Sequence, residues 1–101
     1  PIPIVISTWP FGLPANEAAW IVLSSNGGAH DAVVAAATPC EDDPTVNNVG
    51  LGGLHDASGE VTLDASVLDH AGRCVARACL ESVRGARRAV RGDALIRVDA
   101  V

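Results

Sequence analysis

The sequence has few bulky side chains. Its 101 residues contain two Trp and one Phe, and they contain neither Tyr nor Met. Hydrophobic residues still make up 49% of the sequence, and nearly all of them are Ala, Val, Leu or Ile. Because small side chains each bury less apolar area, we expect closely packed layers with few large anchors. The length suits one domain and no more.

Other absences argue against whole classes of protein. No apolar run reaches the ~18 residues that a membrane helix needs. Lysine is missing, all seven basic residues are Arg, and the formal net charge is −5, so the basic excess of nucleic-acid-binding proteins is lacking. The charged share of 19% is too low for a disordered protein. We therefore expect a folded domain that binds neither membranes nor nucleic acids.

The cysteines and histidines do not form a metal-binding pattern. Three cysteines cannot all pair with one another, and Cys74 and Cys79 are too far apart for a Cys-x-x-Cys motif. This odd number favours reduced thiols and a cytoplasmic setting. The histidines are not at ligand spacing from a cysteine or a carboxylate, so we expect no metal site. The third cysteine is Cys40, and the three histidines are His30, His55 and His70.

The protein begins with an apolar, β-branched segment. Residues 2–8 are mainly Ile and Val and end in Ser-Thr, which predicts a buried strand. Pro10, Gly12 and Pro14 follow closely, and these residues predict a loop over residues 9–14.

Two helices are predicted next. Apolar residues recur at helical spacing from Ala15, with Asn16 as the candidate cap and Gly27-Gly28 as the stop. A second helix is predicted over residues 29–41, where many alanines would allow very close packing against a neighbour. Pro39 lies inside it and should kink or shorten the last turn.

A glycine-rich loop and a hairpin complete the predicted fold. Residues 42–53 form the loop, and residues 61–67 alternate apolar and polar side chains, as a strand does. A turn at residues 69–72 would lead into an antiparallel strand over residues 74–80. An Arg-rich run follows at residues 84–91. The order of elements predicts an α/β fold, layered as α+β.

Few residues suggest chemistry without further information. Gly50-Leu51-Gly52-Gly53 is not a phosphate-binding loop, because no Lys-Ser/Thr follows it. We expect its glycines to allow either positive φ angles or a close approach of the backbone to another segment. Glu41-Asp42-Asp43 is typical of a solvated helix end. No threonine stands beside a base or begins the sequence. Trp9, directly after the predicted strand, is either a core indole or a pocket residue.

Several motifs together resemble the opening of the glycosylasparaginases. The resemblance covers residues 3–82, in order and with compatible spacing. Its motifs are Ser7-Thr8-Trp9-Pro10-Phe11-Gly12, Asn16-Glu17-Ala18-Ala19-Trp20, Gly27-Gly28-Ala29-His30-Asp31-Ala32-Val33, Glu41-Asp42-Asp43-Pro44, Val49-Gly50-Leu51-Gly52-Gly53 and Gly59-Glu60-Val61-Thr62-Leu63-Asp64-Ala65.

The resemblance implies an N-terminal nucleophile hydrolase with an αββα sandwich, of which these residues form the N-terminal part. Such enzymes cleave themselves before a threonine, whose hydroxyl then attacks the amide that joins asparagine to N-acetylglucosamine. The implied substrate is glycosylated asparagine, and no cofactor or metal is required. The residues implied to bind substrate are Trp9, Phe11 and Asn48.

The sequence also departs from the family pattern. Asn48 stands where the family usually has Ser, and His55 where it usually has Pro. The resemblance ends near Gly85, so residues 1–84 are assigned to the family-like part and residues 85–101 to a divergent Arg-rich tail, for which a frameshift or an early stop is one hypothesis. No His-Asp-Thr sequence occurs in these 101 residues, so the predicted set of catalytic residues is empty here.

Three interpretations remain. The protein supplies one wall of a glycosylasparaginase pocket, it is a non-catalytic truncated or degenerate fragment, or it is a relative of the plant-type asparaginases and isoaspartyl peptidases. The expected partner is the C-terminal part, or β subunit, of the same enzyme. Alone, with strand edges and an apolar face uncovered, the protein is expected to be dimeric, aggregation-prone or partly molten.

Overall fold

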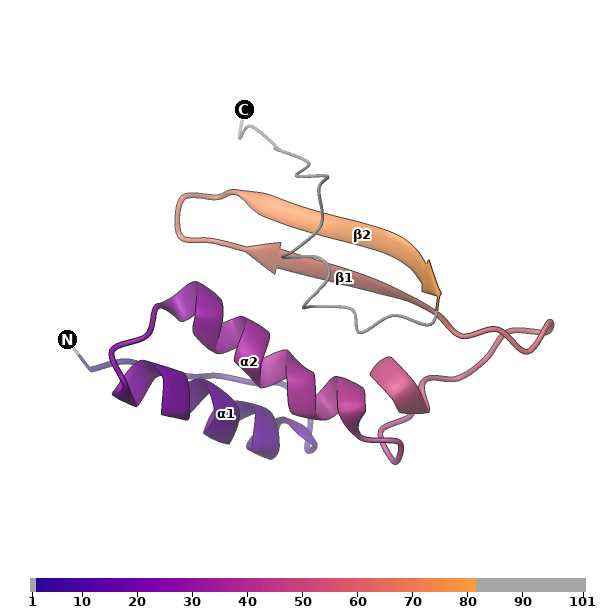
Figure 1. Ribbon diagram of the computed structural model, residues 1–101, viewed down its shortest axis with the longest axis horizontal. Coiled ribbons are helices and arrows are strands. Elements are labelled where there is room, and N and C mark those ends of the chain that lie inside the picture. The colour runs from indigo at the N-terminus through magenta and orange to yellow at the C-terminus, as the bar shows by residue number, and fades with distance from the viewer. Residues whose placement is uncertain (1, 82–101) are drawn as a thin grey trace.

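The computed structural model describes residues 2–81 (Figure 1). The Arg-rich run and the divergent tail proposed for residues 85–101 lie outside this range. The elements in sequence order are α1 (Gly12–Ser24), α2 (Ala29–Asp42), the 3₁₀ turn η1 (Gly50–Gly52), β1 (Thr62–Leu68) and β2 (Cys74–Glu81).

The two helices pack against each other through alanine. Ala15 and Ala19 on α1 and Ala32 on α2 are all buried, with Ala19 only 1% exposed. A methyl group lets two helix backbones approach closely, as expected for the alanine-rich second helix. The link between the helices is short, so they lie side by side (Figure 1).

Helix α1 begins three residues earlier than predicted. It starts at Gly12, after Phe11, and no capping side chain accepts a hydrogen bond from its N-terminal N–H groups. Asn16 lies inside the helix, so the prediction of Asn16 as the cap is wrong. Pro14 falls in the first turn, where a missing N–H costs nothing because that group has no partner within the helix. Gly12 donates to the Trp9 carbonyl over 2.8 Å and leaves room for the Ser7 hydroxymethyl group where a Cβ would stand.

The predicted N-terminal strand is not a strand. Residues 2–8 have no regular secondary structure, and Ile2, Ile4 and Ile6 are 79–86% exposed. A strand needs a neighbour to pair with its N–H and C=O groups. Among residues 2–81 the sheet is the hairpin β1–β2, which leaves this segment without a partner strand.

Helix α2 agrees closely with its prediction. It runs from Ala29 to Asp42 with Pro39 inside it, and it continues three residues beyond the proline. Asp43 follows as the C-cap residue, and its carboxylate accepts hydrogen bonds from the Thr45 N–H at 2.8 Å and the Thr45 hydroxyl at 2.7 Å.

The glycine loop folds tightly against the end of α2. Gly50 has φ +59°, and a Cβ there would overlap the backbone of Glu41. A Cβ at Gly52 would overlap the carbonyls of Pro44 and Val46. Gly50 therefore has a positive φ, and both Gly50 and Gly52 lie close to other backbone segments, as predicted for this loop.

The hairpin forms as predicted. β1 and β2 pair antiparallel, with Val67 opposite Val75 and a shift in register between Leu63 and Ala65. Exposure alternates along β1, and Val67 is the most buried of its residues. In the turn, Asp69 accepts from the N–H groups of Ala71 and Arg73, both at 2.9 Å, and its second oxygen pairs with Arg73 Nε at 2.6 Å.

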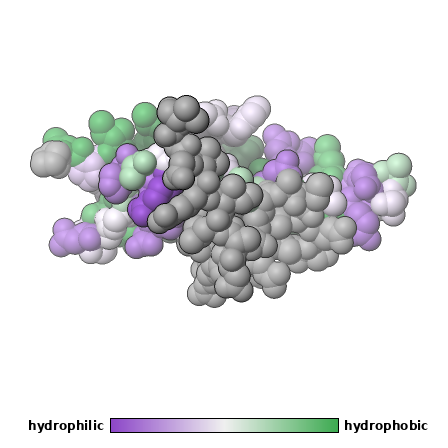
Figure 2. All heavy atoms as spheres, turned by 90° about the horizontal axis from the view of Figure 1, so that it is seen from above, coloured by the Kyte–Doolittle hydropathy of each residue, from purple (hydrophilic) through white to green (hydrophobic). Residues whose placement is uncertain are grey.

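The arrangement is a small α/β unit in which the hairpin lies to one side of the helix pair (Figure 1). Among the residues whose burial the structure describes, five hydrophobic residues are buried, and the largest of them is Val. Apolar residues gather along one edge of the surface (Figure 2). Within the described residues no helix is long and apolar enough to cross a membrane.

We predict that Gly50→Ala destabilises the protein more than Gly59→Ala does. Both glycines have positive φ, but open space surrounds Gly59, so alanine there should cost only about 1 kcal/mol, for the left-handed backbone alone. At Gly50 the overlap with Glu41 adds to the backbone strain, and we expect a loss of at least about 2 kcal/mol in the free energy of unfolding. Urea titration measures both losses when these residues replace the matching segment of a full-length glycosylasparaginase, and equal losses would show that the overlap with Glu41 adds nothing.

We also predict that the hairpin turn weakens in acid. Hydrogen bonds from the backbone and guanidinium of Arg73 and from the Ala71 N–H lower the pKa of Asp69. A lowered folded-state pKa stabilises the fold fully above the ordinary Asp value of about 3.9, and this contribution is lost as pH falls through the folded-state pKa. NMR shifts of the β1 amides between neutral and acid pH measure it. Asp69→Asn should flatten the titration, and an unchanged titration in that variant would refute the assignment.

Candidate functional site

The start of α1 and the end of α2 meet at one place. The Cys40 thiol of α2 donates to the Phe11 carbonyl, just before α1, with an S···O distance of 3.5 Å. Phe11 in turn stacks on Trp9, with ring centroids 6.2 Å apart and ring planes 6° from parallel. Trp9 is 60% exposed, so this indole is not a core residue.

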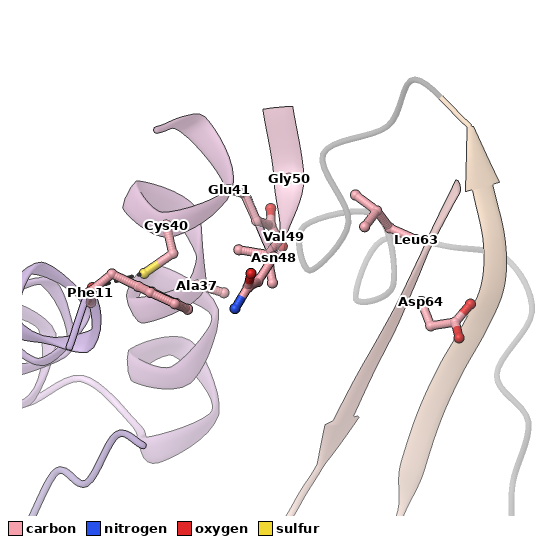
Figure 3. A pocket seen from close by; sticks show the side chains of 9 residues that line it. All are labelled: Phe11, Ala37, Cys40, Glu41, Asn48, Val49, Gly50, Leu63 and Asp64. Carbon is pink, nitrogen blue, oxygen red and sulfur yellow. Dashed lines mark hydrogen bonds between the residues drawn. The ribbon is translucent and has the colours of Figure 1, made fainter. Parts of the chain in front are cut away.

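A cavity of about 330 Å³ opens beside this junction (Figure 3). Four segments line it, namely the residue before α1, the last turns of α2, the loop that leads into η1, and the start of β1. The lining residues are Phe11, Ala37, Cys40, Glu41, Asn48, Val49, Gly50, Leu63 and Asp64.

The three predicted binding residues lie around this cavity, but not equivalently. Phe11 and Asn48 line it, and Figure 3 shows the Asn48 amide directed toward Ala37 and the Phe11 ring. Trp9 does not line it and reaches its edge only through the stack with Phe11. The cavity therefore offers an aromatic face on one side and an amide donor and acceptor beside it.

Three further residues, Glu41, Leu63 and Asp64, complete the lining. Glu41 comes from the last turn of α2, while Leu63 and Asp64 lie across the cavity on the hairpin (Figure 3). Glu41 is half-buried against the glycine loop, so a simple solvated helix end does not describe it. Asp64 is exposed on the outer face of the alternating strand.

Cys40 is suited to packing and not to attack. Burial, followed by the nearby charges of Asp43 and Glu41, raises the pKa of its thiol. A nucleophilic cysteine needs the opposite shift, because the thiolate is the reactive form. Within residues 2–81 no group of three His, Cys, Asp or Glu side chains is placed to hold a metal ion. What the cavity offers is contact surface and hydrogen bonding.

The sequence did not predict Ala37, Cys40 and Leu63 as lining residues. Each has an ordinary role in its own element, and only the tertiary arrangement brings them to one cavity. The alternation in β1 already placed Leu63 on the inward face, but nothing in the pattern showed which segment that face would meet.

Comparisons with known proteins agree with the resemblance. A family model described as asparaginase matches residues 13–91. The N(4)-(beta-N-acetylglucosaminyl)-L-asparaginase of Elizabethkingia miricola is 50% identical over 82 residues, which are 81% of this chain and 24% of that protein. The mouse protein of the same name is 48% identical over 69 residues, or 68% of this chain and 20% of the relative.

A third relative has a different name. The Arabidopsis thaliana protein "Probable isoaspartyl peptidase/L-asparaginase 3" is 43% identical over 67 residues, which are 66% of this chain and 18% of that protein. The 101 residues thus span about a quarter or less of the length of these curated relatives. The family model matches most of the sequence, and these matches confirm the resemblance: the chain belongs to the asparaginase family of hydrolases.

Proposed function

We propose that this protein supplies one wall of the substrate pocket of an N-terminal nucleophile amidohydrolase that cleaves the bond between asparagine and N-acetylglucosamine in glycoproteins. The observation that carries the proposal is the stacked pair of Trp9 and Phe11 beside a cavity lined by Asn48. The Elizabethkingia miricola and mouse relatives, named for this activity, support the choice of substrate.

The chemistry of the wall suits an amide-linked sugar. Ligand pockets combine apolar and aromatic surface with a few polar groups that fix orientation. The exposed indole of Trp9 offers a broad apolar face, and the Asn48 amide can both donate to and accept from hydroxyl or amide groups. We assign the nucleophilic threonine of the family to sequence outside these 101 residues. The oxyanion hole and the remaining substrate-binding residues are assigned there too.

Strand β1 of the hairpin and the segment of residues 2–8 are both largely exposed, which favours a partner from the same enzyme. Within residues 2–81 the hairpin forms a sheet of two strands, and two-stranded sheets are marginally stable alone. The isoleucines of residues 2–8 are open to solvent. We propose that the longer polypeptide of the family adds strands to both places and completes an αββα sandwich, and that the 101 residues without it self-associate or remain partly molten.

One observation favours a second substrate class. The Arabidopsis thaliana relative is named for isoaspartyl peptidase and L-asparaginase activity. If this protein shares that activity, its substrate is free asparagine or an isoaspartyl dipeptide. Neither carries a sugar, so the surface formed by Trp9 and Phe11 would not bind one.

A chimera separates these possibilities. Residues 3–82 replace the matching segment of the Elizabethkingia miricola relative, and release of aspartate is measured from glycosylated asparagine, from free asparagine and from an isoaspartyl dipeptide. We expect activity on glycosylated asparagine. Activity confined to the other two substrates would establish the second class, and a folded chimera without activity on any substrate would establish a non-catalytic fragment.

Within that chimera we predict that Trp9→Ala lowers kcat/KM for glycosylated asparagine by about thirtyfold, because truncation of a binding aromatic typically costs about 2 kcal/mol. Trp20→Ala is the matched control, since Trp20 lies on α1 beside Val5, away from the cavity. It should leave kcat/KM within about twofold of the parent. Equal losses in the two variants would contradict the role of Trp9.

A further inference from the structure

Helix α1 ends on an Asn-Gly pair. Asn26 is exposed and has φ +61°, in the left-handed region. Its N–H donates to the Leu23 carbonyl over 3.2 Å, while the N–H of Gly27 donates to the Val22 carbonyl over 2.8 Å. These two bonds, with Asn26 in the left-handed conformation, form a Schellman motif, which satisfies carbonyls that the helix end leaves free.

We propose that Asn26-Gly27 is a site of spontaneous deamidation and that the Schellman motif controls its rate. The backbone nitrogen of Gly27 bonds to Cγ of Asn26, the bond from Cγ to the amide nitrogen Nδ2 breaks, and ammonia leaves with the proton lost by the Gly27 nitrogen. Water then opens the resulting cyclic imide at either carbonyl. The products are aspartate or isoaspartate at position 26, and no oxidant or cofactor is needed.

Two features of the sequence and structure single out this position among the asparagines. Asn26 is the one of the four that precedes glycine, so no side chain on the following residue hinders approach of the nitrogen to Cγ. The others are Asn16, Asn47 and Asn48, and they precede Glu, Asn and Val. Asn26 is also open to water, which the second step consumes.

The hydrogen bond from Gly27 to Val22 opposes the first step. The attacking nitrogen must give up its proton and turn toward Cγ, whereas the bond directs the N–H to the Val22 carbonyl. The last turn of a helix opens far more often than its middle. Deamidation at Asn26 therefore proceeds through the open form of this turn, and its rate reports on that opening.

Both products would disturb the helix pair. Aspartate places a negative charge at the C-terminus of α1, where the helix dipole is already negative. Isoaspartate adds a methylene to the backbone beside Gly27, whose close contact with Val22 leaves no room for a Cβ. The link from α1 to α2 passes through this point, so modification would loosen the packing of the two helices.

The full protein, incubated at 37 °C across pH 6 to 9 with and without urea, tests this. Peptide mass spectrometry locates the mass increase expected when an amide NH₂ becomes OH, and isoaspartate is resolved by chromatography. We expect modification at Asn26 well before the other three asparagines, faster at higher pH because base removes the Gly27 proton. Urea should accelerate it about fivefold or more, the factor that one typical net hydrogen bond provides.

The matched control is Asn26→Gly, which suits the left-handed conformation and cannot deamidate. It should retain the helical circular dichroism signal and lose the modification at this peptide. Modification at Asn26 no faster than at Asn16, Asn47 and Asn48 would overturn the site itself. A rate that urea leaves unchanged would overturn its control by the Schellman motif.

Discussion

The packing of α1 against α2, in which the buried side chains of both helices are alanines, is the interaction on which the rest of the described structure depends. Ala19 and Ala32 are almost completely buried, so a larger side chain at either position would have to displace packed neighbours. The contact fixes where α1 begins relative to where α2 ends. It thereby sets the Phe11 carbonyl against the Cys40 thiol, and the cavity opens at that junction.

The glycine loop turns this junction into a cavity wall. After α2 the backbone must reverse against that of Glu41, and Gly50 permits this by its positive φ and its missing Cβ. The reversal carries Asn48 back to the side where Phe11 and Ala37 lie (Figure 3). The polar and aromatic parts of the cavity thus come from segments that neither helix alone would bring together.

Local pattern predicted most of the elements and only part of the site. The helical spacing up to Gly27 and the alternation in β1 indicated elements that the structure confirms. Proline and glycine were misleading at the start of α1, because Pro14 is compatible with a first turn. The apolar segment of residues 2–8 has strand composition, but a strand is defined by its partner, and composition does not supply one. Phe11 and Asn48 were identified through the family resemblance, whereas Cys40 and Leu63 join the cavity only through tertiary packing.

The packing of α1 against α2 holds the site together, and substitution of Ala19 by Leu tests this most directly. Ala29→Leu is the control, because Ala29 is exposed at the start of α2. In the chimera with the Elizabethkingia miricola relative, thermal denaturation should show that Ala19→Leu lowers stability by about 1–3 kcal/mol, while Ala29→Leu changes it by less than about 0.5 kcal/mol. If both variants have the same melting temperature as the parent, the packing of α1 against α2 does not stabilise this structure.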